Sequence, residues 1–181
     1  MSESERATGR VLSSRTAWDG GWLQVEVEQV ALPDGREAEM FRVRHPGAAA
    51  IVPVDDDGQV LLLRQYRHAI GRWVLEIPAG KIDDGEEVAA GAARELEEET
   101  GYRPRELIGL GSIWTSPGFT DERIWLFLAR GLESGRQDLE ADELLEIERM
   151  PMEWALEMAV NGELEDGKSV SALLRARRHL E

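Results

Sequence analysis

The segment from Glu86 to Thr100 constrains the fold of this chain more than any other feature of the sequence. Apolar residues recur in it at spacings of three and four, which predicts a helix with one buried face. Gly101 follows directly, and glycine is typical of the position at which a helix ends. We therefore expect a helix of about four turns that packs against a larger core.

Three carboxylates of this helix lie along one edge of its buried face. At about 100° per residue, Glu98 and Glu99 fall within about 60° of Glu95 around the helix axis. Like charges at these spacings destabilise a helix by about 0.2–0.5 kcal/mol per pair, so a cation is expected among them. Mg²⁺ binds carboxylate and phosphate oxygens, and this edge therefore predicts a magnesium site for a phosphate-bearing substrate. The alternative is an ordinary solvated acidic helix.

A loop bracketed by glycines leads into this helix. It runs from Lys81 to Asp84, between Gly80 and Gly85. Backbone carbonyls are among the oxygen ligands of hard divalent ions. We expect the loop to present such a group, the carbonyl of Ala79, to the same ion.

The order of residues through the loop and helix resembles the Nudix box, the signature of hydrolases that cleave nucleoside diphosphates linked to another moiety. Gly80 is followed after five residues by Glu86, and seven residues later by Arg94-Glu95-Leu96-Glu97-Glu98-Glu99-Thr100-Gly101. All seven invariant positions of the box match. Tyr102 stands where the family usually has an aliphatic residue, a departure that concerns packing more than chemistry.

Segments around the box resemble the ADP-ribose pyrophosphatase branch of that family. They are Arg64-Gln65-Tyr66-Arg67, Leu75-Glu76-Ile77-Pro78 and Ser116-Pro117-Gly118. Turn chemistry alone is an alternative explanation of Ser-Pro-Gly. The resemblance implies hydrolysis of ADP-ribose to AMP and ribose 5-phosphate with Mg²⁺, or with Mn²⁺. The alternatives are the same reaction on another nucleoside diphosphate sugar and a noncatalytic nucleotide-sugar sensor.

The resemblance also implies the fold class, an α/β/α Nudix sandwich with a mixed sheet, preceded by a small antiparallel β domain. We expect residues 1–45 to form this N-terminal domain, with roles in dimerisation and base binding, and residues 46–181 to form the hydrolase domain. Alternation of polar and apolar residues on both sides of Pro33-Asp34-Gly35 predicts a hairpin. The apolar runs Ala48–Val54 and Val60–Gln65 predict a second, more buried hairpin.

Two strands and two helices are expected after the box. The strands are Leu107–Ile113 and Ile124–Ala129. One helix runs from Pro151 through Val160, and Ser169 caps the last helix.

The resemblance assigns roles to individual residues of the box. Glu95 and Glu99 would bind the metal directly, Glu98 would be a further ligand or would hold a water, and the Ala79 carbonyl would complete the set. The residues with structural roles would be Gly80, Glu86 and Arg94, of which Arg94 would orient the carboxylates.

The general base would come from an acidic loop after the box. Glu143 lines up best with that position. The alternatives are Glu140 and Asp142, or Glu98 within the box, and Glu143 could also be merely solvated.

Contacts to the rest of the substrate are implied by the same resemblance. Arg67 would lie near the phosphates or the terminal ribose, and Glu76 would accept ribose hydroxyls. Trp22 would stack on adenine in a homodimer that exchanges its N-terminal hairpins. The alternative for Trp22 is a place in the core of the hairpin.

The net charge of the chain disfavours several classes of partner. With 36 acidic and 21 basic side chains in 181 residues, the net charge is −15, which disfavours binding to nucleic acid and to anionic membranes. No apolar run approaches the roughly 20 residues of a membrane helix. Without cysteine there is no disulfide, and we expect a cytoplasmic protein.

Overall fold

The computed structural model describes residues 8–141 and 143–180, which divide into two compact units. One unit holds the N-terminal segment up to Pro46 together with Ser116–Glu122, and the other holds Gly47–Thr115 and the chain from Arg123 onward. The expected roles of residues 1–45 and 46–181 stay predictions.

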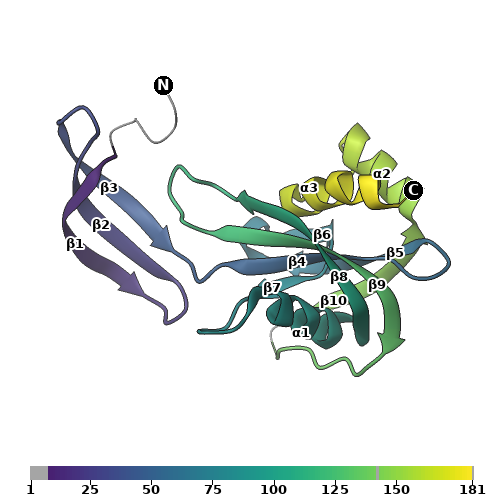
Figure 1. Ribbon diagram of the computed structural model, residues 1–181. Helices are drawn as coiled ribbons and strands as arrows, with labels where there is room; N and C mark the ends of the chain where they lie inside the picture. The colour runs from purple at the N-terminus through teal and green to yellow at the C-terminus, as the bar shows by residue number, and fades with distance from the viewer. Residues whose placement is uncertain (1–7, 142, 181) are drawn as a thin grey trace. The chain divides into compact units, whose positions relative to one another are not determined.

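The N-terminal unit contains one antiparallel sheet (Figure 1). Its strands, in spatial order, are β1 (Arg10–Asp19), β2 (Gln24–Ala31) and β3 (Glu37–Arg44). The hairpin predicted around Pro33-Asp34-Gly35 is confirmed, since β2 pairs with β3 and Gly35 takes a φ of 85°, which favours glycine. Ser116–Glu122 joins this unit through a hydrogen bond of 2.8 Å from the amide of Val43 to the carbonyl of Phe119.

The second unit contains two sheets. The mixed sheet pairs β4 with β9 in parallel and its other neighbours antiparallel. Its strands, in spatial order, are β7 (Ala79–Lys81), β4 (Ala48–Pro53), β9 (Arg123–Ser134) and β8 (Tyr102–Trp114). The antiparallel sheet has the order β10 (Leu145–Pro151), β5 (Gln59–Arg67) and β6 (Arg72–Glu76).

The prediction of a second hairpin is wrong. The chain does turn at Asp55, whose carbonyl accepts a hydrogen bond of 3.0 Å from Gly58, but beyond an isolated bridge from Val54 to Val60 the strands part. β4 lies inside the mixed sheet, and β5 lies inside the antiparallel sheet. Both strands consist of nearly continuous buried runs, and such runs are typical of central strands with a neighbour on each side.

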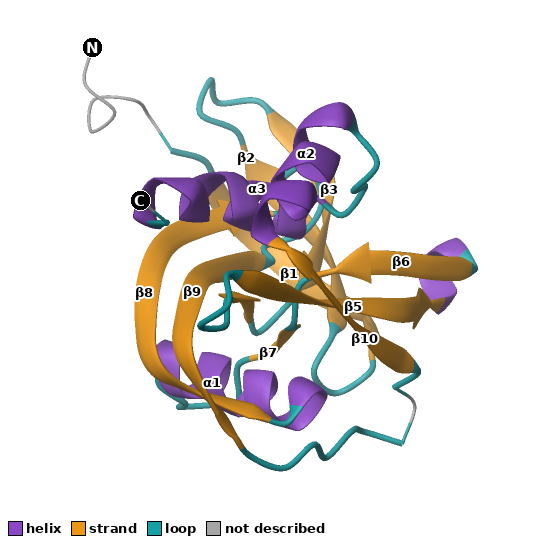
Figure 2. Ribbon diagram, turned by 90° about the vertical axis from the view of Figure 1, so that its right-hand side faces the viewer, coloured by secondary structure: helices purple, strands orange, loops and turns teal. Residues whose placement is uncertain are grey.

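Helices cover both sides of the strands in this unit (Figure 2). Alternate residues of β4 point to opposite faces, so Ile51 packs with α1 and Val52 packs with α3. The helices are α1 (Val88–Thr100), α2 (Met152–Asn161) and α3 (Gly167–Ala176), with short 3-10 turns at His68–Ile70 and Arg177–His179. The predicted α/β/α sandwich is confirmed.

The helix ends show one correct prediction and one error. Gly101 ends α1 with a φ of 75°, as expected. The cap of α3 is Asp166 rather than Ser169, because the Asp166 carboxylate accepts the Ser169 amide proton at 3.0 Å. Ser169 is instead buried in the first turn, where its hydroxyl accepts a hydrogen bond of 2.8 Å from the amide of Ile77.

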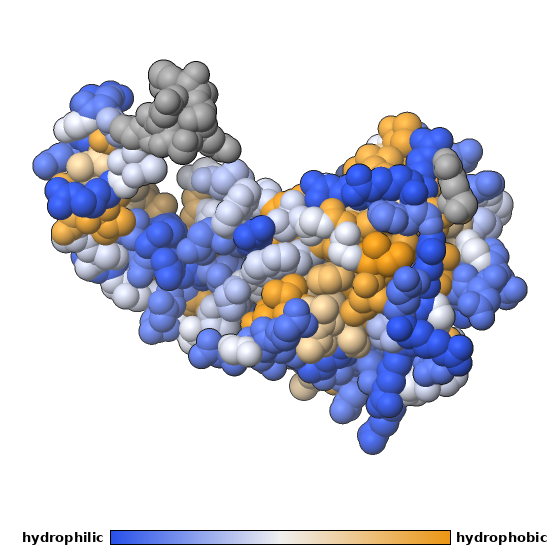
Figure 3. All heavy atoms as spheres, viewed as in Figure 1, coloured by the Kyte–Doolittle hydropathy of each residue, from blue (hydrophilic) through white to orange (hydrophobic). Residues whose placement is uncertain are grey.

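Hydrophilic residues cover much of the face seen in Figure 3, with hydrophobic residues between them. Within residues 8–141 and 143–180, no helix is both long enough and apolar enough to cross a membrane.

Candidate active site

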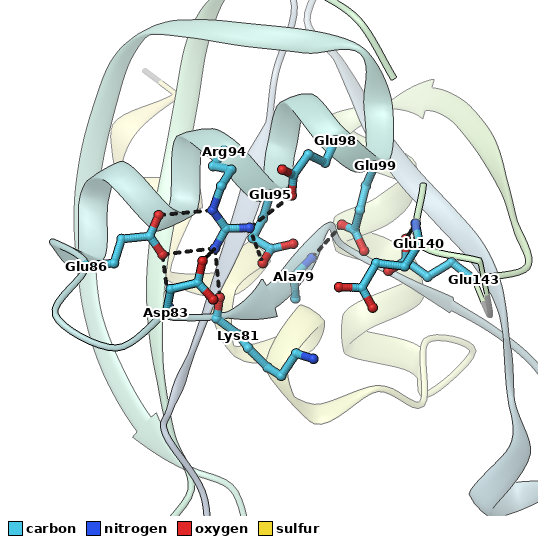
Figure 4. Close-up of polar contacts among 10 residues, drawn as sticks. All are labelled: Ala79, Lys81, Asp83, Glu86, Arg94, Glu95, Glu98, Glu99, Glu140 and Glu143. Carbon is cyan, nitrogen blue, oxygen red and sulfur yellow. Dashed lines mark hydrogen bonds and ion pairs between the residues drawn. The ribbon is translucent and has the colours of Figure 1, made fainter. Parts of the chain in front are cut away.

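α1 brings the carboxylates of the box against the edge strand β7 (Figure 4). Glu99 is only 2% exposed, and one of its oxygens accepts a hydrogen bond of 2.9 Å from the amide of Ala79. The Glu95 carboxylate lies over Gly80, where a Cβ atom would stand 2.0 Å from it. Glycine at position 80 therefore leaves the space that the Glu95 carboxylate occupies.

Arg94 ties the loop to the helix. Its Nε and Nη2 atoms donate to the two oxygens of Glu86 at 3.0 and 2.9 Å, and Nη2 also donates to the carbonyl of Lys81 at 3.0 Å. Its Nη1 atom donates to Glu95 at 2.8 Å and to Glu98 at 2.9 Å. The guanidinium thus holds the loop on one side and orients two carboxylates on the other, as Figure 4 shows.

Glu86 also contacts the backbone of the loop that precedes α1. Its Oε2 atom accepts a hydrogen bond of 3.0 Å from the amide of Asp83. The hydrogen bonds from Arg94 lower the pKa of Glu86 and raise the pKa of Arg94. This pair is therefore ionised, and it stabilises the turn that precedes α1.

Two carboxylates of the cluster have raised pKa values. Burial raises the pKa of Glu99 well above its ordinary range, and the charges of Glu143 and Glu95 add to this shift. The amide of Ala79 and the charge of Lys168 oppose it. Burial also raises the pKa of Glu95, against the hydrogen bond from Arg94. Both carboxylates therefore hold their protons more tightly than an exposed glutamate does, and a bound cation would favour their charged form.

A hard divalent ion suits this donor set. The available donors are oxygens of Glu95, Glu98 and Glu99, with the carbonyl of Ala79 on the adjoining strand (Figure 4). Among the residues that the structure describes, there is no group of three or more acidic or histidine side chains placed to hold a metal ion. Mg²⁺ does not require one, because it usually takes one or two carboxylates and completes its shell with water and phosphate oxygens.

The structure brings the acidic loop before β10 to the same cluster. Glu143 contributes to the raised pKa values of both Glu95 and Glu99, so its charge lies close to theirs. Its carboxylate accepts a hydrogen bond of 2.9 Å from the amide of Glu140. Asp142, the other alternative, lies outside the described residues.

Arg67 pairs with Arg72 at the turn between β5 and β6, and its side chain reaches along β6 to Glu76, at the far end of that strand. Arg67 donates to both oxygens of Glu76, at 2.8 and 2.9 Å, and Glu76 is only 2% exposed. Sequence reasoning missed Lys168, which also donates to Glu76 and lies 3.0 Å from Asp166. Its position as a base directly after a long acidic run was the signal that could have identified it.

Trp22 belongs to the N-terminal unit, just before β2. Its side chain is 54% exposed and makes an edge-to-face contact with the ring of His45 at 5.3 Å. Trp22 is therefore not part of a hydrophobic core in the described chain.

Comparison with known proteins gives consistent matches. A family model described as the NUDIX domain matches residues 43–174. The ADP-ribose pyrophosphatase of Bacillus subtilis (strain 168) is 37% identical over 166 residues, which cover 91% of this chain and 90% of that protein. The methanol dehydrogenase activator of Bacillus methanolicus is 34% identical over 166 residues, with coverage of 91% and 90%. A solved structure of an ADP compounds hydrolase has the same fold, with a TM-score of 0.82 at 24% identity over 96% of this chain and 94% of that chain.

Proposed function

The chain belongs to the Nudix family and is an enzyme that acts on nucleoside diphosphates, and from this premise we propose that it hydrolyses ADP-ribose to AMP and ribose 5-phosphate. The observation that carries this proposal is the cluster in which Arg94 orients Glu95 and Glu98 beside the buried Glu99. Support for the substrate comes from the ADP-ribose pyrophosphatase of Bacillus subtilis, which matches over most of both chains.

Nudix hydrolases generally depend on a divalent metal ion, and we assign Mg²⁺ to this chain, with Mn²⁺ as a substitute. Such an ion, when bound, would supply positive charge against the pyrophosphate and would lower the pKa of a water molecule. The residues that would hold it are Glu95, Glu98, Glu99 and the carbonyl of Ala79. Arg94 keeps Glu95 and Glu98 in place, and the Ala79 amide keeps Glu99 in place.

Glu143 is the proposed general base. A base must lie within hydrogen-bond reach of the attacking water, directly or through one further water. The proximity of Glu143 to Glu95 and Glu99 supports this role, and its hydrogen bond from the Glu140 amide orients the carboxylate. Glu98 would serve as a further ligand or would hold a water.

The remaining substrate contacts are proposals of the same kind. Arg67 would bind the phosphates or the terminal ribose, and its bidentate pair with Glu76 supports a fixed guanidinium orientation. Glu76 would accept ribose hydroxyls in addition. Trp22 would stack on adenine in a homodimer, and its exposed indole ring supports a contact outside the core of its own unit.

Incubation with Mg²⁺ and a panel of nucleoside diphosphate sugars, followed by chromatography of the products, tests the proposed function. We expect AMP and ribose 5-phosphate from ADP-ribose, at a rate well above that of the other sugars. Preference for another sugar would move the assignment to that substrate. The Arg94 network argues against a noncatalytic sensor, which does not need its carboxylates oriented, and loss of all turnover on removal of the metal would support hydrolysis through this site.

A further inference from the structure

A second charged cluster adjoins the box carboxylates. It joins Arg67 at the end of β5 and Glu76 at the end of β6 to Lys168 and Asp166 at the start of α3. Glu76 lies three residues before Ala79, whose amide donates to Glu99 at 2.9 Å, so the cluster adjoins the candidate metal ligands. The cluster contains two positive and two negative side chains, so its net charge is zero.

We propose that Lys168 is a positioning residue, which holds the buried carboxylate of Glu76 so that Glu76 in turn fixes the guanidinium of Arg67 toward the substrate. This inference rests on the proposed function, because Arg67 is a proposed substrate contact. Lys168 itself touches no reacting atom in this proposal.

The burial of Glu76 is the first argument. Its side chain is almost completely removed from solvent, and a buried carboxylate is tolerated only when charge and hydrogen bonds compensate it. Arg67 occupies both oxygens, and Lys168 adds a second positive charge on Oε2. Glu76 is thus held from two sides, by a strand and by a helix.

The placement of Lys168 is the second argument. It lies in the first turn of α3, where the helix dipole disfavours a positive charge. Its side chain is only 11% exposed, so solvation does not explain the position either. The ion pairs with Glu76 and Asp166 are what this ammonium group gains there.

The hydrogen-bond donors of Arg67 that Glu76 does not use are the third argument. Its Nε and Nη2 atoms donate to Glu76, whereas Nη1 makes no hydrogen bond to any residue within the described part of the chain. The Arg67 side chain is 41% exposed. A guanidinium fixed on one edge and open on the other is suited to bind an anionic or hydroxylated ligand.

The start of α3 also fixes the backbone beside Glu76. The buried hydroxyl of Ser169 accepts the amide proton of Ile77 at 2.8 Å, two residues before Ala79. The first turn of α3 therefore controls both the side chain of Glu76 and the main chain that follows it.

A double-mutant cycle in the full-length protein tests this inference. Steady-state kinetics are measured for Lys168→Met, Arg67→Met and the double variant, on whichever nucleotide sugar the wild type hydrolyses. We expect Lys168→Met to raise KM about three- to tenfold with kcat within about twofold. Because Lys168 acts through Arg67, the KM of the double variant should match that of Arg67→Met alone. Lys168→Arg, which keeps the charge, should restore most of the wild-type KM.

Three results would overturn the inference. One is additive effects of the two substitutions on KM. Another is a shift in the Mg²⁺ concentration needed for half-maximal rate with KM unchanged, which would make Lys168 a partner of the metal ligands. The third is a normal KM in Lys168→Met. Lys168→Gln, which retains a hydrogen-bond donor, replaces the Met variant in the cycle if that variant does not fold.

Controls separate this test from the proposed function. Arg103→Met breaks an exposed ion pair with Glu97 on another surface and should leave KM unchanged. Failure of the wild type to hydrolyse ADP-ribose would refute the proposed substrate. The ratios between variants, measured on the sugar that is hydrolysed, decide the role of Lys168 separately.

Discussion

Replacing Gly80 with alanine would introduce one methyl group where the carboxylate of Glu95 now lies. The new Cβ would stand 2.0 Å from Cδ and Oε2 of Glu95, and a Cβ is essentially never found closer than 3.0 Å to another heavy atom. The carboxylate would therefore have to retreat by at least about 1 Å, away from its hydrogen bond with Arg94.

The expected loss of activity follows from this displacement. A misplacement of about 1 Å can reduce a rate about 100-fold, which corresponds to roughly 2.7 kcal/mol of activation free energy. The fold should tolerate the change, because Gly80 does not have the positive φ that excludes alanine and the atoms displaced are the end of a flexible side chain. We expect the free energy of unfolding to change by less than about 1 kcal/mol, or about 2–4 °C in Tm.

The assay is kcat at saturating ADP-ribose and Mg²⁺, with the melting temperature measured on the same samples. Gly109→Ala is the matched control, since nothing lies within 4 Å of a Cβ at that position in β8 and its φ is not positive. It should keep normal activity. If Gly80→Ala retains more than about a third of the wild-type kcat, the packing of Glu95 on Gly80 does not position a metal ligand, and the reasoning is refuted.

The remaining predictions concern the metal cluster, the base and the adenine contact. Glu99→Gln should abolish turnover and, in EDTA, keep or raise Tm because it relieves carboxylate repulsion; more than about a tenth of wild-type activity would contradict the metal role. The raised pKa of Glu99 means that the folded state keeps this proton at pH values where the unfolded chain has lost it. The free energy of unfolding of the metal-free wild type should therefore fall as pH rises from 4.5 through the folded pKa, and calorimetry should find a smaller fall in Glu99→Gln, in which only the contribution of Glu95 is left. Glu143→Gln should lower kcat with little change in KM; a normal Glu143→Gln beside a crippled Glu140→Gln would mean that the loop is right and the residue is wrong. Trp22→Ala should raise KM for ADP-ribose about five- to hundredfold at unchanged Tm, and sedimentation that shows a fully active monomer would remove the proposed dimer.

The sequence by itself determined the features that depend on residues close together along the chain. The helical spacing after Glu86 and the glycine at position 101 predicted α1 and its end, and the turn Pro33-Asp34-Gly35 predicted the hairpin of β2 and β3. The gathering of Glu95, Glu98 and Glu99 on one edge follows from helix geometry alone. These features are local because their hydrogen bonds and side-chain spacing lie within one element or one turn.

Only the tertiary structure decided which strands pair and which side chains meet. The apolar runs of β4 and β5 are compatible with a hairpin, but burial on both faces requires neighbours on each side, and these come from strands distant in sequence. Lys168 meets Glu76 across 92 positions of the chain. The charge pattern of the sequence indicates that a basic residue near an acidic run will form an ion pair. It does not indicate which acidic residue will be its partner. That choice depends on the packing of α3 against the sheets, which places the ammonium group beside the buried carboxylate of Glu76.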